Sequence, residues 1–188
     1  TVLVGPGVWA TSTPDPLINP AGKPITIQSV EGAETTFLDG ELIGTVVICT
    51  SGETTDTVID GFTIMRGYAN NASNHGGGIY CNNSGPWIKN CIITDCAATQ
   101  GAGIYLGNGS DGRISNCTFT SNVGGAGGAV YNGYNSGALF EGCTFDLNRA
   151  YDGGAFATSH WGVTIFKSCV FSNNEAFGTY GGAIGGGP

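Results

Sequence analysis

Apolar residues recur every 26 residues in the later part of the chain. Cys117 to Asn122 reads CTFTSN, and the segments that begin at Cys143 and Cys169 read CTFDLN and CVFSNN. One step earlier, Cys91 to Cys96 reads CIITDC. A fixed period of roughly 20 to 50 residues indicates one structural unit per period, stacked on its neighbours.

Each of these segments alternates between apolar and more polar positions, as a short strand with one buried face does. We therefore expect the cysteine and the Ile or Phe two residues later to point inward. The period aligns three apolar columns: Ile88, Ile114, Phe140 and Phe166; Cys91, Cys117, Cys143 and Cys169; and Ile93, Phe119, Phe145 and Phe171.

A second strand is expected half a period away, where a small-residue pair precedes an aliphatic or aromatic residue. The apolar residue is expected to face inward and the residue after it outward. Two or three short strands per 26 residues, without a helical pattern, predict one coil of a parallel β-helix, an all-β fold that 188 residues extend to about seven coils. The inward residues of the second strand are Ile79, Ile104, Val130, Phe156 and Ile184.

Two inward columns are expected to be structural. The amides of Asn122, Asn148 and Asn174 can bond from coil to coil in a ladder at a turn. The four thiols that begin with Cys91 and end with Cys169 are expected to pack in the core. The remaining cysteines are Cys49, Cys81 and Cys96, of which one pair could be oxidised, and the spacing leaves that pairing open.

The length fits a single domain, residues 1–188. Residues 1–57 are less regular and are expected to form the first coils with longer loops. Residues 58–188 carry the regular repeats, since Ile59, Phe62 and Ile64 stand 29 residues before Ile88, Cys91 and Ile93.

These repeats resemble known families. The Gly-Gly-Ala-aliphatic motif that alternates with FxxN, at Phe119–Asn122, Phe145–Asn148 and Phe171–Asn174, resembles the repeats of chlamydial polymorphic membrane proteins. The segments TVLVGPGVW, PITIQSVEG, FLDG and VIDGFTI resemble right-handed β-helix proteins of the pectin-lyase-like superfamily. The resemblance implies a right-handed parallel β-helix and a secreted or cell-surface location, and it matches no catalytic motif of the enzymes with this architecture.

Charge and composition exclude several classes of partner. The formal net charge is −8 with six Lys and Arg, whereas nucleic-acid binding needs a basic surface. No apolar run approaches about 18 residues, so no membrane insertion by this segment is expected. With two His and no CxxC motif, the sequence predicts neither a metal site nor a cofactor.

Carboxylates are candidate catalytic groups because polysaccharide enzymes use them. A hydrolase needs two at a defined separation, and a lyase needs a calcium-binding cluster with a base. Asp95, Asp146 and Asp152 occupy different register positions, and the nearby bases are Arg113 and Arg149. The sequence therefore favours a protein without catalysis.

Two charge pairs that share a column one coil apart agree with solvated, paired surface charges. They are Glu141 with Lys167, and Arg66 with Asp95. Such exposed pairs stabilise by at most about 1 kcal/mol.

Tyr80, Tyr105 and Tyr131 form an outward column at spacings close to one coil. Stacked rings can bind sugar faces, which makes these residues a candidate ligand site. They can equally cover the sheet and stabilise it.

We expect an extracellular or cell-surface β-solenoid with a structural or adhesive role and no catalysis. No amphipathic helix or polar segment caps either end, which predicts a slice of a longer rod or copies stacked head to tail in a filament. Expected partners are a second copy and cell-surface glycans. The alternatives are a polysaccharide lyase or hydrolase, a fragment of one, or a carbohydrate-binding module.

Overall fold

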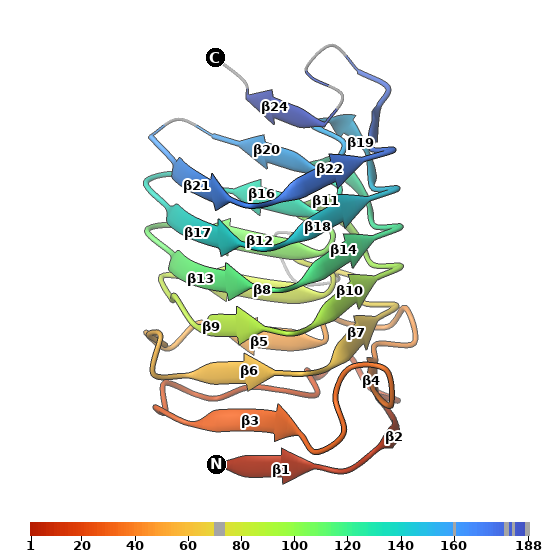
Figure 1. Ribbon diagram of the computed structural model, residues 1–188, viewed down its shortest axis with the longest axis vertical. Helices are drawn as coiled ribbons and strands as arrows, with labels where there is room; N and C mark the ends of the chain where they lie inside the picture. The colour runs from red at the N-terminus through yellow and green to blue at the C-terminus, as the bar shows by residue number, and fades with distance from the viewer. Residues whose placement is uncertain (70–73, 160, 179–180, 182, 187–188) are drawn as a thin grey trace.

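The computed structural model describes residues 1–69, 74–159, 161–178, 181 and 183–186. These residues form short strands joined by turns, and the coils stack from the N-terminal end at the bottom of Figure 1 to the C-terminal end at its top. Among the described residues there is no helix long and apolar enough to cross a membrane.

The strands belong to four parallel sheets, named A to D here. Sheet A contains β1 (Val2–Val4), β3 (Thr26–Ser29), β6 (Val58–Asp60), β9 (Trp87–Lys89), β13 (Asp111–Ser115), β17 (Gly137–Glu141) and β21 (Val163–Lys167). Sheet B contains β2 (Gly7–Ala10), β4 (Thr36–Asp39), β7 (Thr63–Met65), β10 (Ile92–Thr94), β14 (Thr118–Thr120), β18 (Thr144–Asp146) and β22 (Val170–Ser172). Sheet C contains β5 (Val47–Cys49), β8 (Ile79–Asn82), β12 (Ile104–Gly107), β16 (Val130–Asn132), β20 (Phe156–Thr158) and β24 (Ile184–Gly186). Sheet D contains β11 (Ala97–Gln100), β15 (Val123–Ala126), β19 (Arg149–Asp152) and β23 (Glu175–Ala176).

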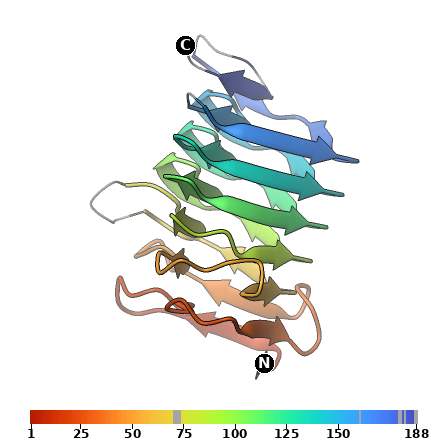
Figure 2. The ribbon, with the colours of Figure 1, turned by 90° about the vertical axis from the view of Figure 1, so that its left-hand side faces the viewer.

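The chain visits the sheets in the same order in each regular coil, which confirms the predicted parallel β-solenoid. Coils 4 to 7 begin at β9, β13, β17 and β21 and pass through sheets A, B, D and C in turn. Sheets A and B each hold seven strands, one per coil, so seven coils are present as predicted. Figure 2 shows the same stack from the side.

Each regular coil contains four strands, one more than the two or three expected. The additional strand belongs to sheet D. Its strands are built from segments such as Ala97–Gln100 and Val123–Ala126, which carry small residues. Small residues give no alternation between apolar and polar positions, so this sheet leaves no clear pattern in the sequence.

The residues of each predicted column are paired in register on neighbouring strands. Ile88 pairs with Ile114 in sheet A, and Phe119 pairs with Phe145 in sheet B. Ile59 pairs with Ile88 across the 29-residue step. Parallel, in-register pairing therefore holds where equivalent residues are 26 apart and also where a longer loop makes the spacing 29.

Each coil turns its corners with residues in the left-handed backbone region. Between sheets D and C, the corner residue of coil 5 is Gly127, with φ of +63°. An added Cβ there would stand 2.0 Å from the carbonyl oxygen of Val130, so a side chain does not fit. Between sheets B and D, the corner positions tolerate side chains: Arg66, Asp95, Ser121, Leu147 and Asn173.

Aromatic rings fill the core of the later coils. The buried ring of Phe145 stacks on Phe119 at a centroid distance of 4.9 Å and on Phe171 at 4.6 Å. Phe140, from sheet A, meets Phe145 edge-on at 5.7 Å. Such aromatic pairs add about 0.5–1.5 kcal/mol each beyond the burial of their area.

The asparagine ladder forms beside the B–D corner and is buried. Asn122 Nδ2 donates to Asn148 Oδ1 at 2.9 Å, and Asn148 Nδ2 donates to Asn174 Oδ1 at 3.0 Å. The same amide groups donate to core carbonyls, as Asn148 Nδ2 does to Phe119 O at 3.0 Å. The carboxamide oxygens accept from backbone as well, since the Asn122 N–H donates to Asn148 Oδ1 at 3.2 Å. Asn122 and Asn148 thus each bond to the coil below and to the coil above, and Asn174 bonds to the coil below.

We expect Asn148→Ala to reduce the free energy of unfolding by about 3 kcal/mol, because it leaves buried donors and acceptors of two neighbouring coils without partners. Urea unfolding measures this loss. The control is Thr118→Ala, on the outward side of the same stack, which should change stability by less than about 0.5 kcal/mol. Equal effects of the two substitutions would contradict a buried ladder.

We expect Phe145→Ala to cost about 3–5 kcal/mol, because it removes a fully buried ring from a stack and leaves a cavity. Tyr134→Ala, at a ring that is 61% exposed, is the matched control and should cost little. Thermal unfolding of both variants measures the loss of stability. A small effect of Phe145→Ala would contradict the placement of that ring in the core.

Candidate functional site

The tyrosine column lies on the outer side of sheet C and is stacked ring on ring. Tyr80 and Tyr105 stand 5.3 Å apart with nearly parallel rings, and Tyr105 and Tyr131 stand 5.8 Å apart. The ring of His75 meets Tyr105 at 4.5 Å. All three tyrosines are half-buried, and burial raises the pKa of Tyr105, with a further contribution from its tyrosine neighbours.

This packing changes what the column can bind. Both faces of the Tyr105 ring are covered by its neighbours, so a sugar cannot stack on that ring. The ring edges remain for contact with a ligand. Sugar binding by Tyr80, Tyr105 and Tyr131 stays a prediction, whereas their cross-strand stacking is observed and stabilises the sheet.

Charged side chains on sheet A pair with one another. Arg113 Nη2 lies 3.0 Å from Glu141 Oε2, and Lys167 Nζ lies 3.8 Å from Glu141 Oε1, which confirms the predicted Glu141–Lys167 pair. Lys89 Nζ and the Arg113 guanidinium lie 4.6 and 4.7 Å from the ring centroid of Trp87. The Trp87 ring therefore joins two coils through cation–π contacts.

The expected pair between Arg66 and Asp95 was wrong. Arg66 Nη2 binds Asp39 Oδ2 instead, and also lies 2.8 Å from Glu41 Oε1. The hydrogen bonds and charge of Asp39 raise the pKa of Arg66, while the Asp95 charge contributes least among the causes. Arg66 and Asp95 do share a corner column, but the arginine turns toward the coil below.

The three aspartates considered for catalysis do not come together. Asp95 lies at the B–D corner of coil 4, Asp146 on sheet B and Asp152 on sheet D of coil 6. Asp146 accepts hydrogen bonds from Ser172 Oγ and Asn173 Nδ2, both at 2.8 Å. No three His, Cys, Asp or Glu side chains within the described ranges are close enough to hold one metal ion.

The thiol column lies inside, at the A–B corner. Cys91, Cys117 and Cys143 are buried and Cys169 is partly buried. The Cys117 thiol donates to the carbonyl of Ser115 at 3.4 Å, and burial raises its pKa. A buried protonated thiol is a poor nucleophile, so Cys117 serves packing.

The structure places the other cysteines too. Cys49 lies directly beside Cys81 on neighbouring strands of sheet C, and both are buried free thiols. Cys96 instead occupies the asparagine column, where its N–H donates to Asn122 Oδ1 at 3.1 Å. Burial raises the pKa of Cys96 to about 12.

A serine ladder at the C–A corner was not predicted. The Ser84 N–H donates to Ser110 Oγ at 3.3 Å, and the Ser110 N–H donates to Ser136 Oγ at 3.2 Å. All three serines are buried. Their 26-residue spacing was the available signal, but serine in a loop ordinarily indicates a solvated turn.

Glu53 ends this ladder with a carboxylate that is 2% exposed. It accepts hydrogen bonds from the Gly22 N–H at 2.8 Å, the Ser51 N–H at 2.9 Å and Ser84 Oγ at 2.8 Å. Burial alone would raise the pKa of Glu53, but these hydrogen bonds together hold it below its ordinary value. Glu53 is therefore a structural anchor for two loops.

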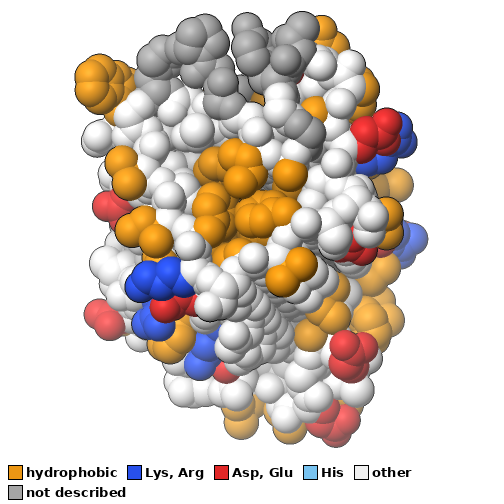
Figure 3. Space-filling model, turned by 45° about the horizontal axis from the view of Figure 1, so that its top comes forward, with side chains coloured by type: hydrophobic (Ala, Val, Ile, Leu, Met, Phe, Trp, Pro, Cys, Tyr) orange, Lys and Arg blue, Asp and Glu red, His pale blue; other side chains and the backbone are white. Residues whose placement is uncertain are grey.

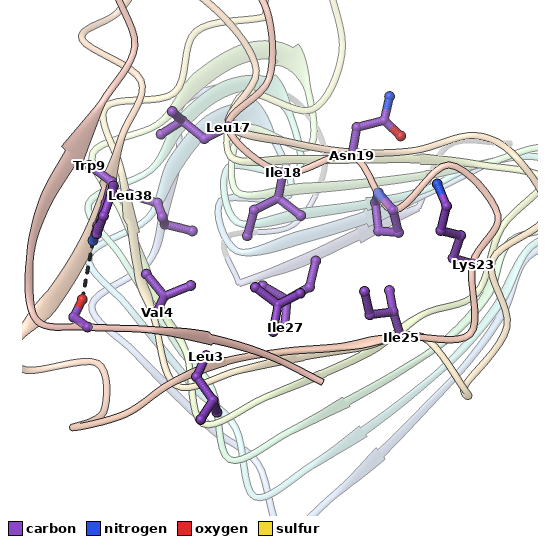
Figure 4. Close-up of a pocket in the computed structure, with 13 residues that line it drawn as sticks. Leu3, Val4, Trp9, Leu17, Ile18, Asn19, Lys23, Ile25, Ile27 and Leu38 are labelled. Carbon is purple, nitrogen blue, oxygen red and sulfur yellow. Dashed lines mark hydrogen bonds between the residues drawn. The ribbon is translucent and has the colours of Figure 1, made fainter.

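An apolar cavity of about 480 Å³ opens at the first coil (Figure 4). Val4, Ile18, Ile27 and Leu38 point toward its centre, and Trp9 stands at one side with Nε1 donating to Gly5 O at 3.2 Å. The lining is the end of the same core that the higher coils fill. It can accept apolar side chains from another coil stacked in parallel.

A family model described as a right-handed β-helix region matches residues 35–187. The chain belongs to this family. The handedness that the resemblance implied is thereby confirmed. Searches of curated proteins and of solved structures each found no match.

Family membership assigns an architecture to this β-helix but does not assign a reaction, because one fold hosts many functions. The side chains that its sequence singled out fall into two groups. The Asn and Cys columns are interior, and the Tyr column is on the surface. Of these groups, only the Tyr column can contact a ligand without opening the core.

We expect a thiol reagent to modify no more than about one cysteine of the native protein, namely the partly buried Cys169, before unfolding exposes the rest. Mass spectrometry after timed labelling measures this. Rapid modification of four or more thiols would contradict the inward column.

The anchor at Glu53 predicts a pH dependence. Its folded pKa lies below its unfolded value, so it stabilises the fold above the unfolded pKa of about 4.5 and loses that contribution as the pH falls through the folded pKa. Glu53→Gln should thus be less stable than wild type at about pH 6, and the difference should shrink by about pH 3. Urea unfolding at both pH values tests it. A pH-independent difference would mean that the charge of Glu53 is not involved.

Proposed function

We propose that this right-handed β-helix is a structural and adhesive rod without catalytic activity, at work outside the cell or on its surface. The observation that carries the proposal is that inward side chains bond and stack from coil to coil along the solenoid. Asn122 and Asn148, Ser84 and Ser110, and Phe119 and Phe145 each connect successive coils. These contacts hold a stiff scaffold that presents flat faces to a partner.

The outer charges also support a role without catalysis. Ion pairs in the described part of the chain involve five of its six Lys and Arg side chains. Arg113 is paired with Glu141, and Arg149 Nε lies 2.8 Å from Glu175 Oε2. The two arginines that are candidate bases for a lyase are thus engaged in ion pairs with carboxylates.

The rival function is cleavage of a polysaccharide. The protein should produce no new reducing ends and no unsaturated products from polygalacturonate, xylan or galactomannan. A known polysaccharide lyase and a known hydrolase are the positive controls. Product that increases with the concentration of this protein would overturn the proposal.

We further propose that copies of this chain stack head to tail. β1 and β21 are the outermost strands of sheet A, and β2 and β22 those of sheet B. At the last coil, Phe166 and Phe171 are only partly buried, and Figure 3 shows hydrophobic side chains gathered at this end. These rings match the apolar cavity at the first coil, and strand pairing between copies would continue both sheets.

Electron microscopy and sedimentation over a concentration series test this stacking. Filaments one solenoid thick are expected, and Val4→Lys should shorten them because Val4 points into the cavity and its replacement puts a charge there. Monomers at every concentration would contradict the stacking and leave the proposal of a rod without catalysis in place.

A further inference from the structure

Two buried cysteines lie side by side in sheet C. Cys49 ends β5 in coil 2, Cys81 is the third residue of β8 in coil 3, and the two are paired in register. Both are fully buried. Neighbouring strands of a sheet are about 4.8 Å apart, and disulfides join Cα atoms about 4.4–6.8 Å apart. The backbone therefore holds this pair at a separation that a disulfide can span.

The contacts of the thiols distinguish this pair from the other cysteines. Each of the other five thiols donates to the carbonyl two residues before it, at 3.2–3.5 Å: Cys91, Cys96, Cys117, Cys143 and Cys169. In the described part of the chain neither Cys49 nor Cys81 donates to a carbonyl, and their thiols contact each other. This contact, together with burial, raises the pKa of the Cys81 thiol. Both side chains can thus rotate without breaking a hydrogen bond to the backbone.

The register also gives neither cysteine a competing partner. Cys81 pairs on its other side with Leu106 of coil 4. Cys96, the third cysteine outside the thiol column, has Asn122 as its neighbour in the asparagine column. Of these three cysteines, only Cys49 and Cys81 can be joined without rearranging the coils.

The place of β5 in the sheet favours the small movement that a disulfide requires. Disulfide-bonded Cβ atoms stand about 3.8 Å apart, which is closer than in-register neighbours usually stand. β5 is an outermost strand of sheet C, and below it the described chain forms one isolated bridge, from Ile18 to Val47. Cys49 is the last residue of β5, and the exposed residues 50–52 follow it. The end of β5 can therefore move toward β8 while the coils above keep their register.

We propose that Cys49 and Cys81 form a disulfide that joins coil 2 to coil 3 when the folding chain meets a low-molecular-weight disulfide. The thiolate of one cysteine attacks the external disulfide, forms a mixed disulfide and releases one external thiol. The second cysteine then displaces the other external thiol and completes the protein disulfide. The two protein thiols give up two electrons and two protons, and one external disulfide becomes two thiols.

This inference rests on the proposed location outside the cell, where disulfides form and persist. It adds a covalent connection below the asparagine column, which connects coils 4 to 7. Because both thiols are buried in the folded protein, we expect the reaction during folding and only slowly afterwards.

Refolding of the reduced protein in glutathione disulfide tests the site. The intact mass should be about 2 Da lower than after refolding in dithiothreitol, because two hydrogens are lost. Alkylation in denaturant should then label five of the seven cysteines. Trypsin cleaves after Arg66 and Lys89, so Cys49 and Cys81 fall on separate peptides that the disulfide joins.

Variants separate this pair from the remaining thiols. Cys81→Ala should abolish the joined peptides, whereas Cys96→Ala, at an equally buried cysteine of the next coil, should keep them. The oxidised wild-type protein should unfold at a temperature about 5 °C or more above that of the reduced protein. Cys81→Ala should unfold at the same temperature after either treatment. The peptide map of the wild-type protein decides the pairing even where a variant does not fold.

The outcomes separate this inference from the proposed function. Seven alkylated cysteines after refolding in glutathione disulfide would overturn the disulfide, as would a stable glutathione adduct or a cross-link within the column that contains Cys117. Each of these results leaves the rod without catalysis in place. Cleavage of a polysaccharide would overturn the rod and leave the cross-link in place.

Discussion

The hydrogen bonds that the asparagine amides make between coils constrain how the rest of the solenoid is built. Asn122, Asn148 and Asn174 each use both sides of the amide, so a coil that slipped by one residue would leave buried polar atoms unpaired. Backbone pairing in a parallel sheet can shift in register more easily than this ladder can. The ladder therefore aligns the phenylalanine stack, the thiol column and the outward faces.

Most of the interior could be predicted from the sequence, because each coil contributes one residue of the same type to each inward position. The columns that contain Phe145, Cys117 and Asn148 are all recognisable by their spacing. Sheet D could not be predicted in the same way, since segments such as Val123–Ala126 hold small residues on both sides of the strand. Ser110 shows a second limit, because a serine in a loop looks the same whether its hydroxyl is buried in a ladder or solvated.

The surface was harder to predict than the core. Arg66 was matched with Asp95 because they share a column, but the side chain is long enough to choose among neighbours and it binds Asp39. Stacked tyrosines were expected from their spacing, yet the covered faces of Tyr105 are a property of ring orientation. A shallow groove lined by Tyr68, Ala97 and Val123 depends on residues of coils 3 to 5 and on glycines that have no side chain. The 26-residue repeat does not reveal such a groove.

The inside and the outside of the rod therefore have different roles. Inward ladders make the coils stiff, while the outer sheets differ from one another. Sheet A carries paired charges, and sheet D and its flanks carry an apolar strip that includes Tyr68, Val123, Tyr151 and Phe177. The apolar strip on sheet D and the ion pairs on sheet A agree with the proposed adhesive role.

Hydrogen exchange of side-chain amides, followed by nuclear magnetic resonance, tests the central role of the ladder most directly. The Nδ2 protons of Asn122 and Asn148 should exchange as slowly as the backbone amides of β14 and β18, because both open only when coils separate. The exposed amide of Asn135 provides the fast reference. Exchange of Asn122 and Asn148 at the rate of Asn135 would show that the amides are open to water and would contradict a buried ladder.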